Sequence, residues 1–296
     1  MAPRVAVSKT YKLYLGGAFP RSESGRTYPV TDAQGAFMAN AAQASRKDVR
    51  DAVSAARKGF GSWSRATPYN RGQVIYRIAE MVESRAADLA RLLQESRGVS
   101  AREAATEVEQ SVDRLVHYAG WTDKLAAVFG GANPVSGPYF SYSAPEPTGV
   151  VGVLAPAGAP LLGLVSCLAP AIAGGNACVL VAAQDDPCVA ITFAEALATS
   201  DLPGGVVNVL TGSAAEVSPH LAAHLDVNAL DLTGAKPGLR TELERLAAQS
   251  IKRVYAPRSA PDFTGAPGTA RLRAFLEIKT VWHPVGAVSL AGGGGY

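Results

Sequence analysis

The stretch Pro147–Gln184, PTGVVGVLAPAGAPLLGLVSCLAPAIAGGNACVLVAAQ, decides the fold and contains no charged residue. About 20 apolar residues suffice for a transmembrane helix, so its length alone is compatible with a membrane span. Pro156 and Pro160 interrupt it near its start, and Gly174-Gly175-Asn176 near its end. Because buried parallel strands and their covering helices are apolar on all sides, the stretch predicts a sheet core rather than a membrane span. The predicted elements are a strand at Val150–Leu154, a helix over Leu161–Ala173 and a strand at Ala177–Ala183.

Composition and charge exclude several classes of protein. The 296 residues carry a formal net charge of +3, and 18% are charged, without the basic block typical of nucleic-acid-binding proteins. The start, MAPRVAVSKTYKLYLGG, has no long apolar core and no cleavage pattern, so no signal peptide is expected. Cys167, Cys178 and Cys188 are odd in number and lie in apolar surroundings, which disfavours a disulfide framework. These features predict a cytoplasmic protein that binds neither nucleic acid nor a membrane.

The first part of the chain is predicted to be mainly helical. A short strand at Tyr11–Leu15 precedes repeated turn signals over residues 18–44. Ser45 with Asp48 and Ser100 with Glu103 have the spacing of capping boxes, and Thr67-Pro68 is typical of a helix start. The three amphipathic helices predicted from these signals span residues 45–63, 67–98 and 100–129.

Strands and helices alternate after the opening stretch. The predicted elements are a helix after Pro187, a strand at Val206–Leu210, a helix over Ala214–His224, a strand at Ala229–Leu232, a helix over Pro237–Gln249 and a strand at Lys252–Tyr255. Together with the two strands of the opening stretch, they predict an α/β fold with a five-stranded, doubly wound parallel sheet of the Rossmann type.

Two segments outside this sheet alternate in the manner of a β ribbon. Residues 138–144, PYFSYSA, alternate aromatic and small polar residues, and residues 277–283, EIKTVWH, alternate as well. Residues 256–270 contain three prolines and two glycines and are predicted to be a linker. Because the second segment follows this linker, we expect it to pair with the first rather than to extend the parallel sheet.

Several phrases of the chain resemble the aldehyde dehydrogenase superfamily, in the family's order and over nearly the whole length. They are KLYLGGAFPRSESGRTYPV (12–30), DVRDAVSAARKGFGSWS (48–64), RGQVIYRIAEMVESRAADLARLLQESRG (71–98), REAATEVEQSVDRLVHYAGWTDKL (102–125), PTGVVGVLAP (147–156), LAPAIAGGNACVL (168–180), LPGGVVNVLTG (202–212) and ALDLTGA (229–235). The strand EIKTVW (277–282) resembles the family's C-terminal arm, most closely that of the divergent branch with a second, non-catalytic copy of the fold. The resemblance implies N-terminal helices, a cofactor-type sheet and a small β arm.

The chain departs from the residues that hold cofactor and oxyanion in the family. The family's Pro-Trp-Asn-Phe-Pro turn, whose asparagine stabilises the oxyanion, is Pro-Ala-Gly-Ala-Pro here, with Gly158 at the asparagine position. The family's Lys-Pro-(Ala/Ser)-Glu, which grips the adenosine ribose, is replaced by a segment with Val181 and Gln184 in place of lysine and glutamate. The Phe-Thr-Gly-Ser turn near the pyrophosphate is reduced to Leu-Thr233-Gly234-Ala235. We therefore expect no cofactor, and NAD or NADP binding at a degenerate crevice remains the alternative.

The family's catalytic domain is expected to be absent. After Lys252-Arg253-Val254 the family continues with Glu-Leu-Gly-Gly-Lys, whose glutamate is the general base, and with a domain that carries the nucleophilic cysteine in a Gly-Gln-Cys setting. This chain continues with YAPRSAPDFTG (255–265) and reaches the arm by residue 277. The expected division is a strand and helical part (1–131), the first part of an oligomerisation arm (132–147), the sheet domain (148–255), a linker in place of the catalytic domain (256–272), the arm strand (273–290) and a disordered tail (291–296).

The remaining cysteines and histidines offer weak candidates for chemistry. Cys167 and Cys178 are expected in the core, whereas Cys188 at a helix start leaves open an activated thiol, although no histidine lies near it in sequence. His220 and His224 have the spacing of two metal ligands, but neither a glutamate nor a third ligand accompanies them. We expect no metal and no catalytic residue, and a structural role for His117 and His283.

The arm suggests the partner. In the family, the arm of one subunit packs against the catalytic domain of its neighbour, and a chain without that domain cannot cover its own arm in this way. The expected interface residues are Tyr139, Phe140, Tyr142, Ile278, Val281 and Trp282. The first hypothesis is a pseudoenzyme subunit in a hetero-oligomer with a full-length aldehyde dehydrogenase. The alternatives are an NAD(P)-dependent aldehyde oxidoreductase in its own right, and a nucleotide-binding sensor that uses the sheet edge at Gly212 and Gly234.

Overall fold

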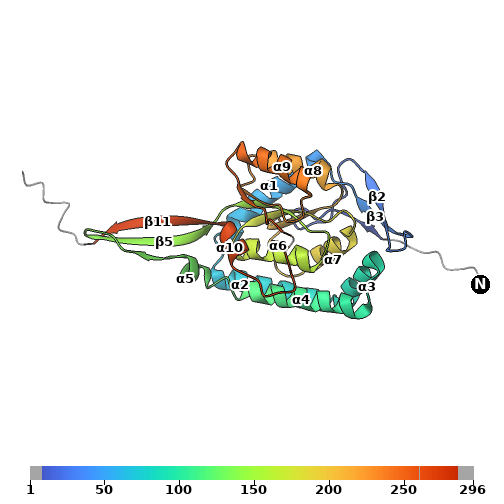
Figure 1. The fold of residues 1–296 in the computed structure, drawn as a ribbon, viewed down its shortest axis with the longest axis horizontal. Coiled ribbons are helices and arrows are strands. Elements are labelled where there is room, and N and C mark those ends of the chain that lie inside the picture. Colours follow the sequence, from blue (N-terminus) through green and yellow to red (C-terminus); the bar gives the residue numbers. More distant parts are fainter. Residues whose placement is uncertain (1–8, 260, 286–296) are drawn as a thin grey trace, which may run out of the picture.

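The computed structural model describes residues 9–259 and 261–285, which form a three-layered body and a β arm that projects from it (Figure 1). The central layer is a five-stranded parallel sheet, as predicted. In spatial order its strands are β10 (Arg253–Tyr255), β9 (Ala229–Asp231), β6 (Val150–Leu154), β7 (Ala177–Val181) and β8 (Val207–Leu210).

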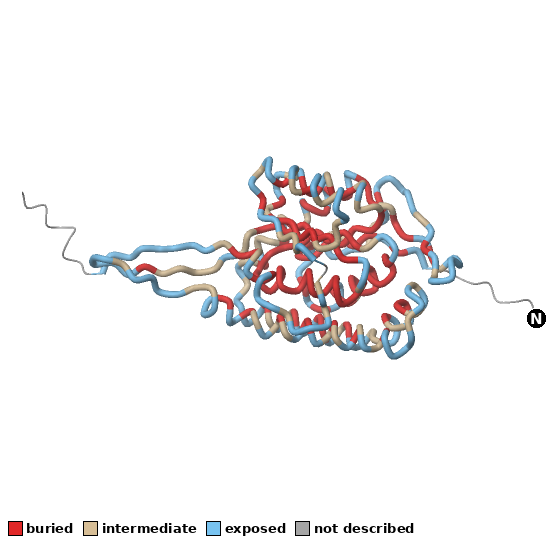
Figure 2. Tube along the Cα trace, viewed as in Figure 1, coloured by how far each residue is buried: buried red, intermediate tan, exposed pale blue. Residues whose placement is uncertain are grey.

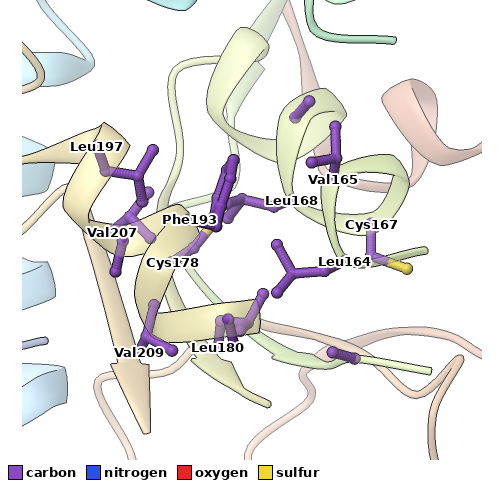
Figure 3. Close-up of a cluster of buried hydrophobic side chains, with 14 of the residues drawn as sticks. Leu164, Val165, Cys167, Leu168, Cys178, Leu180, Phe193, Leu197, Val207 and Val209 are labelled. Carbon is purple, nitrogen blue, oxygen red and sulfur yellow. The ribbon is translucent and has the colours of Figure 1, made fainter. Parts of the chain in front are cut away.

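The stretch that decides the fold lies in the middle of this sheet. Strands β6 and β7 and the helix between them, α6 (Leu162–Ala173), are buried at every residue. Figure 3 shows α6 side chains, among them Leu164 and Leu168, meeting Phe193 of the next helix over β7. Each such side chain contributes roughly 1.5–3 kcal/mol when fully buried. Within the described part of the chain, no helix has both the length and the apolar character needed to cross a membrane.

Helices cover both faces of the sheet and mostly begin where the sequence predicts. They are α1 (Arg46–Trp63), α2 (Pro68–Glu83), α3 (Ala86–Arg97), α4 (Ala101–Ala119), α5 (Leu125–Phe129), α7 (Pro187–Leu197), α8 (Ala214–Ala223), α9 (Pro237–Ala248) and α10 (Ala270–Ala274). Both predicted capping boxes are present, at Ser45 and Ser100. Trp63 anchors the end of α1 because its indole Nε1 donates to the Ile172 carbonyl at 2.9 Å.

Two of the predicted helices are divided, which corrects the sequence prediction. The helix expected from 67 to 98 breaks at Ser84 and Arg85, whose side chains both donate to the Met81 carbonyl at 2.9 and 3.2 Å. The helix expected to reach residue 129 ends at Ala119, whose carbonyl accepts from the Thr122 hydroxyl at 2.9 Å. In both places a side chain donates to a carbonyl of the last helical turn. At Ser84 and Arg85, neither glycine nor proline signals the break in the sequence.

The N-terminal segment adds a second small sheet. Its strands β1 (Thr10–Tyr11), β2 (Thr27–Thr31) and β3 (Phe37–Ala42) lie in the order β1-β3-β2. Strands β2 and β3 fall within residues 18–44, where the residue pattern predicted only turns. The strand expected at 11–15 is shorter, and its Tyr14 instead bridges Val209 of the main sheet.

The arm contains strands β4 (Gly131–Asn133), β5 (Tyr139–Pro147) and β11 (Leu276–Pro284) in the order β11-β5-β4. The predicted pairing of the two alternating segments is confirmed, because β11 runs antiparallel to β5 from Leu276 opposite Pro147 to Pro284 opposite Tyr139. The last residues of the expected linker belong to a short helix, α10, which packs against α6. The expected disordered tail, 291–296, and the end of the expected arm segment lie outside the described residues.

Candidate functional site

The carboxyl edge of the parallel sheet holds the predicted site residues. In the turn after β6, Gly158 is exposed, and a Cβ built there has no atom within 4 Å. Val181 is the last residue of β7 and is buried, so it presents no polar group to this edge. Gln184 is exposed, and its backbone carbonyl accepts from the Tyr28 hydroxyl at 3.0 Å. The structure thus places these three residues near adjacent strand ends without joining them in one hydrogen-bonded cluster.

The turn after β9 lies next to the end of β6 and is closed by the protein's own backbone. The N–H of Gly234 donates to the Leu154 carbonyl at 3.0 Å, and that of Ala235 donates to the Leu232 carbonyl at 3.0 Å. A Cβ at Gly234 would lie 2.5 Å from the carbonyl carbon of Ala155 and 2.8 Å from the oxygen of Leu154. Gly234 is therefore required by the approach of two backbone segments.

A buried ion pair that the sequence did not predict lies beside this turn. Arg271 of α10 contacts the carboxylate of Asp231, and the side chains of these two residues are 8% and 0% exposed. The Thr233 hydroxyl donates to Asp231 Oδ1 at 2.5 Å and accepts from Arg271 Nη1 at 3.0 Å. The guanidinium also lies 4.5 Å from the centre of the Tyr255 ring. Burial raises the pKa of Asp231, and the charge of Arg271 opposes that shift.

Residues 256–259 and 261–275, here called the cover segment, pass over the same edge. The ring of Phe263 lies 3.3 Å from a Cβ built on Gly163, in the first turn of α6. Arg114 of α4 holds the segment in place by donating from Nη2 to the carbonyls of Phe263 and Gly265 at 2.5 and 3.0 Å. The cover segment is therefore packed on the body and closes part of the edge.

The start of α6 is also satisfied from within the chain. Glu107 of α4 accepts from the N–H groups of Leu161 and Leu162 at 2.9 and 3.1 Å. Free N–H groups at a helix start favour an anion, and here a carboxylate of the protein already binds them.

The sequence contained only one signal for the contacts made by Asp231, Arg271, Glu107 and Arg114 at this edge. Asp231 is a lone acid in an otherwise apolar strand, and a buried carboxylate needs a partner. Arg271 lies 40 positions away, Glu107 and Arg114 lie on a helix much earlier in the chain, and no sequence spacing connects them.

The cysteines and histidines do not form a catalytic arrangement in the described ranges. Cys167 and Cys178 lie in the core as predicted, and burial raises the pKa of both. Cys188 is buried too, and burial raises its pKa to about 12, which argues against an activated thiol. His220 lies in α8, whereas His224 caps its end and accepts from the Asp226 N–H through Nδ1 at 3.2 Å. No group of three or more possible metal ligands occurs in residues 9–259 and 261–285.

The native thiols are expected to react slowly. With every cysteine side chain buried and the Cys188 pKa near 12, almost no accessible thiolate exists at pH 8. A chromogenic disulfide reagent at pH 8 should release colour slowly from the folded chain and stoichiometrically for three thiols after unfolding in guanidinium. Rapid modification of one thiol in the folded chain would contradict this description of Cys188.

Comparison with known proteins identifies the family. The model of the aldehyde dehydrogenase family matches residues 19–260. The chain belongs to the aldehyde dehydrogenase family. It is 34% identical over 256 residues to aldehyde dehydrogenase family 2 member B4, mitochondrial, of Arabidopsis thaliana, covering 85% of this chain and 47% of that protein.

Solved structures share the fold, among them one of an aldehyde dehydrogenase. HpcC from Thermus thermophilus superposes with a TM-score of 0.78 at 31% identity, over 83% of this chain and 47% of that one. The NAD+ complex of aldehyde dehydrogenase from Bacillus cereus also gives 0.78, at 28% identity, over 83% of this chain and 50% of that one. The chain therefore has the aldehyde dehydrogenase fold and spans about half the length of these relatives.

Proposed function

We propose that the chain is a non-catalytic member of the aldehyde dehydrogenase family that assembles, in the cytoplasm, with a full-length aldehyde dehydrogenase that has an intact catalytic domain. The observation that supports this most is the arm, which projects from the body as a three-stranded ribbon (Figure 1). Most of the arm's length is exposed or half-buried, whereas the interior of the body is buried (Figure 2).

The exposed arm residues have the character of an interface. Large apolar side chains cluster on two neighbouring strands, and β11 is an edge strand of the arm sheet in the described structure. Their exposed fractions are Tyr139 47%, Phe140 49%, Ile278 47%, Val281 38% and Trp282 57%, and Tyr142 beside them is half-buried. Aromatic residues on an open strand edge favour pairing with another chain. The partner that fits best is one that supplies the surface against which the family's arms pack.

The path of the chain from the sheet to the arm supports a non-catalytic role. Strand β10 ends at Tyr255 and the arm strand β11 begins at Leu276, so the cover segment alone joins them. In the family, the general base and the catalytic domain would follow β10. Here the segment instead places Phe263 and Arg271 against the edge where that chemistry would take place.

A dinucleotide fits this edge poorly. Gly158 and Val181 supply no hydrogen-bonding side chain, and the backbone carbonyl of Gln184 is already bound by Tyr28. The turn at Gly234 is filled by the backbone of β6, and Glu107 presents a carboxylate at the start of α6. These contacts support the expectation that the chain does not depend on NAD or NADP, and no reaction step is assigned to either.

Assembly is tested by co-expression with a full-length aldehyde dehydrogenase of the same organism. We expect the two chains to co-elute in size-exclusion chromatography, and replacement of Trp282 by serine to weaken the complex at least about tenfold, as for a central interface aromatic. Phe37→Ser is the matched control, because Phe37 has the same 57% exposure but lies on β3 of the body. Separate elution of the wild-type chains, or equal losses for both variants, would overturn the proposal.

Family membership itself favours an alternative, an NAD(P)-dependent aldehyde oxidoreductase in its own right, and a nucleotide sensor is a further alternative. Both are tested on the isolated chain. A panel of aldehydes with NAD or NADP should yield no reduced cofactor, and calorimetric titration with either cofactor should show no binding. Turnover would establish the oxidoreductase, and binding without turnover would establish the sensor.

A further inference from the structure

Strand β11 forms one long side of the arm, from the body to the tip (Figure 1). Its register with β5 runs without a shift from Leu276 to Pro284, and every residue of the strand after Glu277 is exposed. Proteins usually keep edge strands short, bulged or interrupted by proline, because an open edge pairs readily with another chain. Strand β11 is regular, and its one proline is its last residue.

The backbone groups that face away from the arm belong to alternate residues of β11. At the tip, the N–H of Val285 donates to the Pro138 carbonyl at 2.7 Å. Because hydrogen-bonded pairs alternate along an antiparallel ladder, this bond shows that the odd-numbered residues of β11 bond to β5. The N–H and carbonyl groups of Ile278, Thr280 and Trp282 therefore point outward, and within the described part of the chain no hydrogen bond reaches them.

The side chains of these three residues share one face of the arm and suit strand pairing. Isoleucine and threonine are β-branched and tryptophan is aromatic, which are the types favoured in strands. The rings of Trp282 and Tyr139 pack edge to face with their centres 5.9 Å apart. The hydroxyls of Thr280 and Ser143 share a hydrogen bond of 2.8 Å. The open edge is therefore held in place by the arm's own contacts.

We propose that β11 pairs with β11 of a second copy of this chain, antiparallel and about a two-fold axis at Thr280. In this register Thr280 lies opposite Thr280 of the second copy, and Ile278 lies opposite Trp282 of the second copy. Pairs of threonines, and pairs of an aromatic with a β-branched residue, stabilise antiparallel sheets. The two arms form one continuous sheet, and the symmetry repeats each contact.

Charge and proline select this register over its neighbours. An axis one residue nearer the body would place Lys279 directly opposite Lys279 of the second copy, and like charges in that position are destabilising. An axis one residue nearer the tip would bring Pro284, which has no N–H, further into the ladder. With the axis at Thr280, Pro284 falls at the end of the pairing and Glu277 lies opposite His283. No two like charges then face each other.

The shape of the molecule allows this pairing. The arm projects from the body, so two antiparallel arms place the two bodies at opposite ends of the joint sheet (Figure 1). Each arm is then covered along its open edge without a catalytic domain. The inference goes beyond the proposed assembly and does not rest on it. A full-length relative that uses the same edge would compete with the second copy.

Analytical ultracentrifugation of the isolated 296-residue chain tests the pairing. We expect a concentration-dependent dimer of the 30.6 kDa chain. Thr280→Pro should raise its dissociation constant about thirtyfold, the equivalent of two hydrogen bonds, because both N–H groups at the axis are lost. Since this N–H does not face β5, the variant should still unfold cooperatively.

Thr280→Val is the matched control, because it keeps the N–H and the size of the side chain. Its dissociation constant should stay within about twofold of the wild type. A wild-type chain that remains monomeric at micromolar concentrations, or equal effects of the two substitutions, would overturn the proposal.

A disulfide tests the register. Thr280→Cys should form a disulfide between two copies under mild oxidation, because residues of a directly opposite pair lie about 5.5 Å apart between Cα atoms. Ile278→Cys is the control on the same edge, since its counterpart lies about 13 Å further along the strand. The native cysteines are buried and should not interfere. Non-reducing electrophoresis compares the two variants.

No disulfide at position 280, or equal disulfide formation at 280 and 278, would overturn the register. Both tests use the isolated chain. Their failure is therefore a separate result from a failure to co-elute with a full-length relative.

Discussion

Replacement of Arg271 by alanine is expected to lower the free energy of unfolding by about 3–5 kcal/mol, the range for removing one partner of a buried ion pair. The loss arises because Asp231, which is 0% exposed, would keep its carboxylate without a counter-charge. The same change removes the contact between α10 and the end of β9, so the cover segment should detach as well. Urea unfolding followed by circular dichroism measures the first effect, and limited proteolysis after Arg258 or Arg273 measures the second.

Arg273→Ala is the matched control, because Arg273 lies on the same short helix and is exposed. We expect its cost to stay within about 0.5 kcal/mol. Adding Asp231→Asn to the Arg271→Ala chain should recover part of the stability, since it removes the stranded charge. If the two arginine variants are equally stable, the ion pair does not hold the cover segment.

The second large effect is expected at Gly234. Replacement by alanine places a Cβ closest to the carbonyl oxygen of Ala155, 2.5 Å from its carbonyl carbon and 2.8 Å from the oxygen of Leu154. These are backbone atoms at the end of a buried strand and cannot move aside as a side chain would. We expect a loss of about 3 kcal/mol in the free energy of unfolding, at the upper end for an overpacked site. Thermal unfolding by calorimetry gives the same ranking as a lower Tm.

Gly158 provides the comparison at the neighbouring strand end. A Cβ there has no atom within 4 Å, so Gly158→Ala should change the stability by no more than about 0.5 kcal/mol. Equal destabilisation by the two substitutions would show that the turns, rather than the close backbone approach at Gly234, determine the cost. Gly158 stands at the family's asparagine position, and Gly234 directly precedes the position where the family has a serine. Of the two glycines, only Gly234 is required by packing.

Much of the body could be predicted from the sequence because its signals are local. Proline and glycine divide the apolar stretch into β6, α6 and β7, and the alternation that follows predicts the remaining strands of the parallel sheet. The same is true of the capping boxes at Ser45 and Ser100, where two residues three positions apart determine the helix start. The breaks at Ser84 and Gly120 were missed because side-chain bonds to the last turn, and tertiary packing of the two halves, override a continuous helical pattern.

The sequence by itself determined the family, the parallel sheet and the pairing of the two arm segments, and it predicted which family positions had lost their polar side chains. The strands and helices follow from periodicity and short motifs between near neighbours in the chain, and the arm pairing follows from the alternation that each of the two distant segments shows by itself. Only the tertiary structure decided that Arg271 pairs with Asp231 and that Glu107 binds the start of α6. These contacts join residues tens of positions apart, and they depend on where the cover segment packs, which no local pattern specifies.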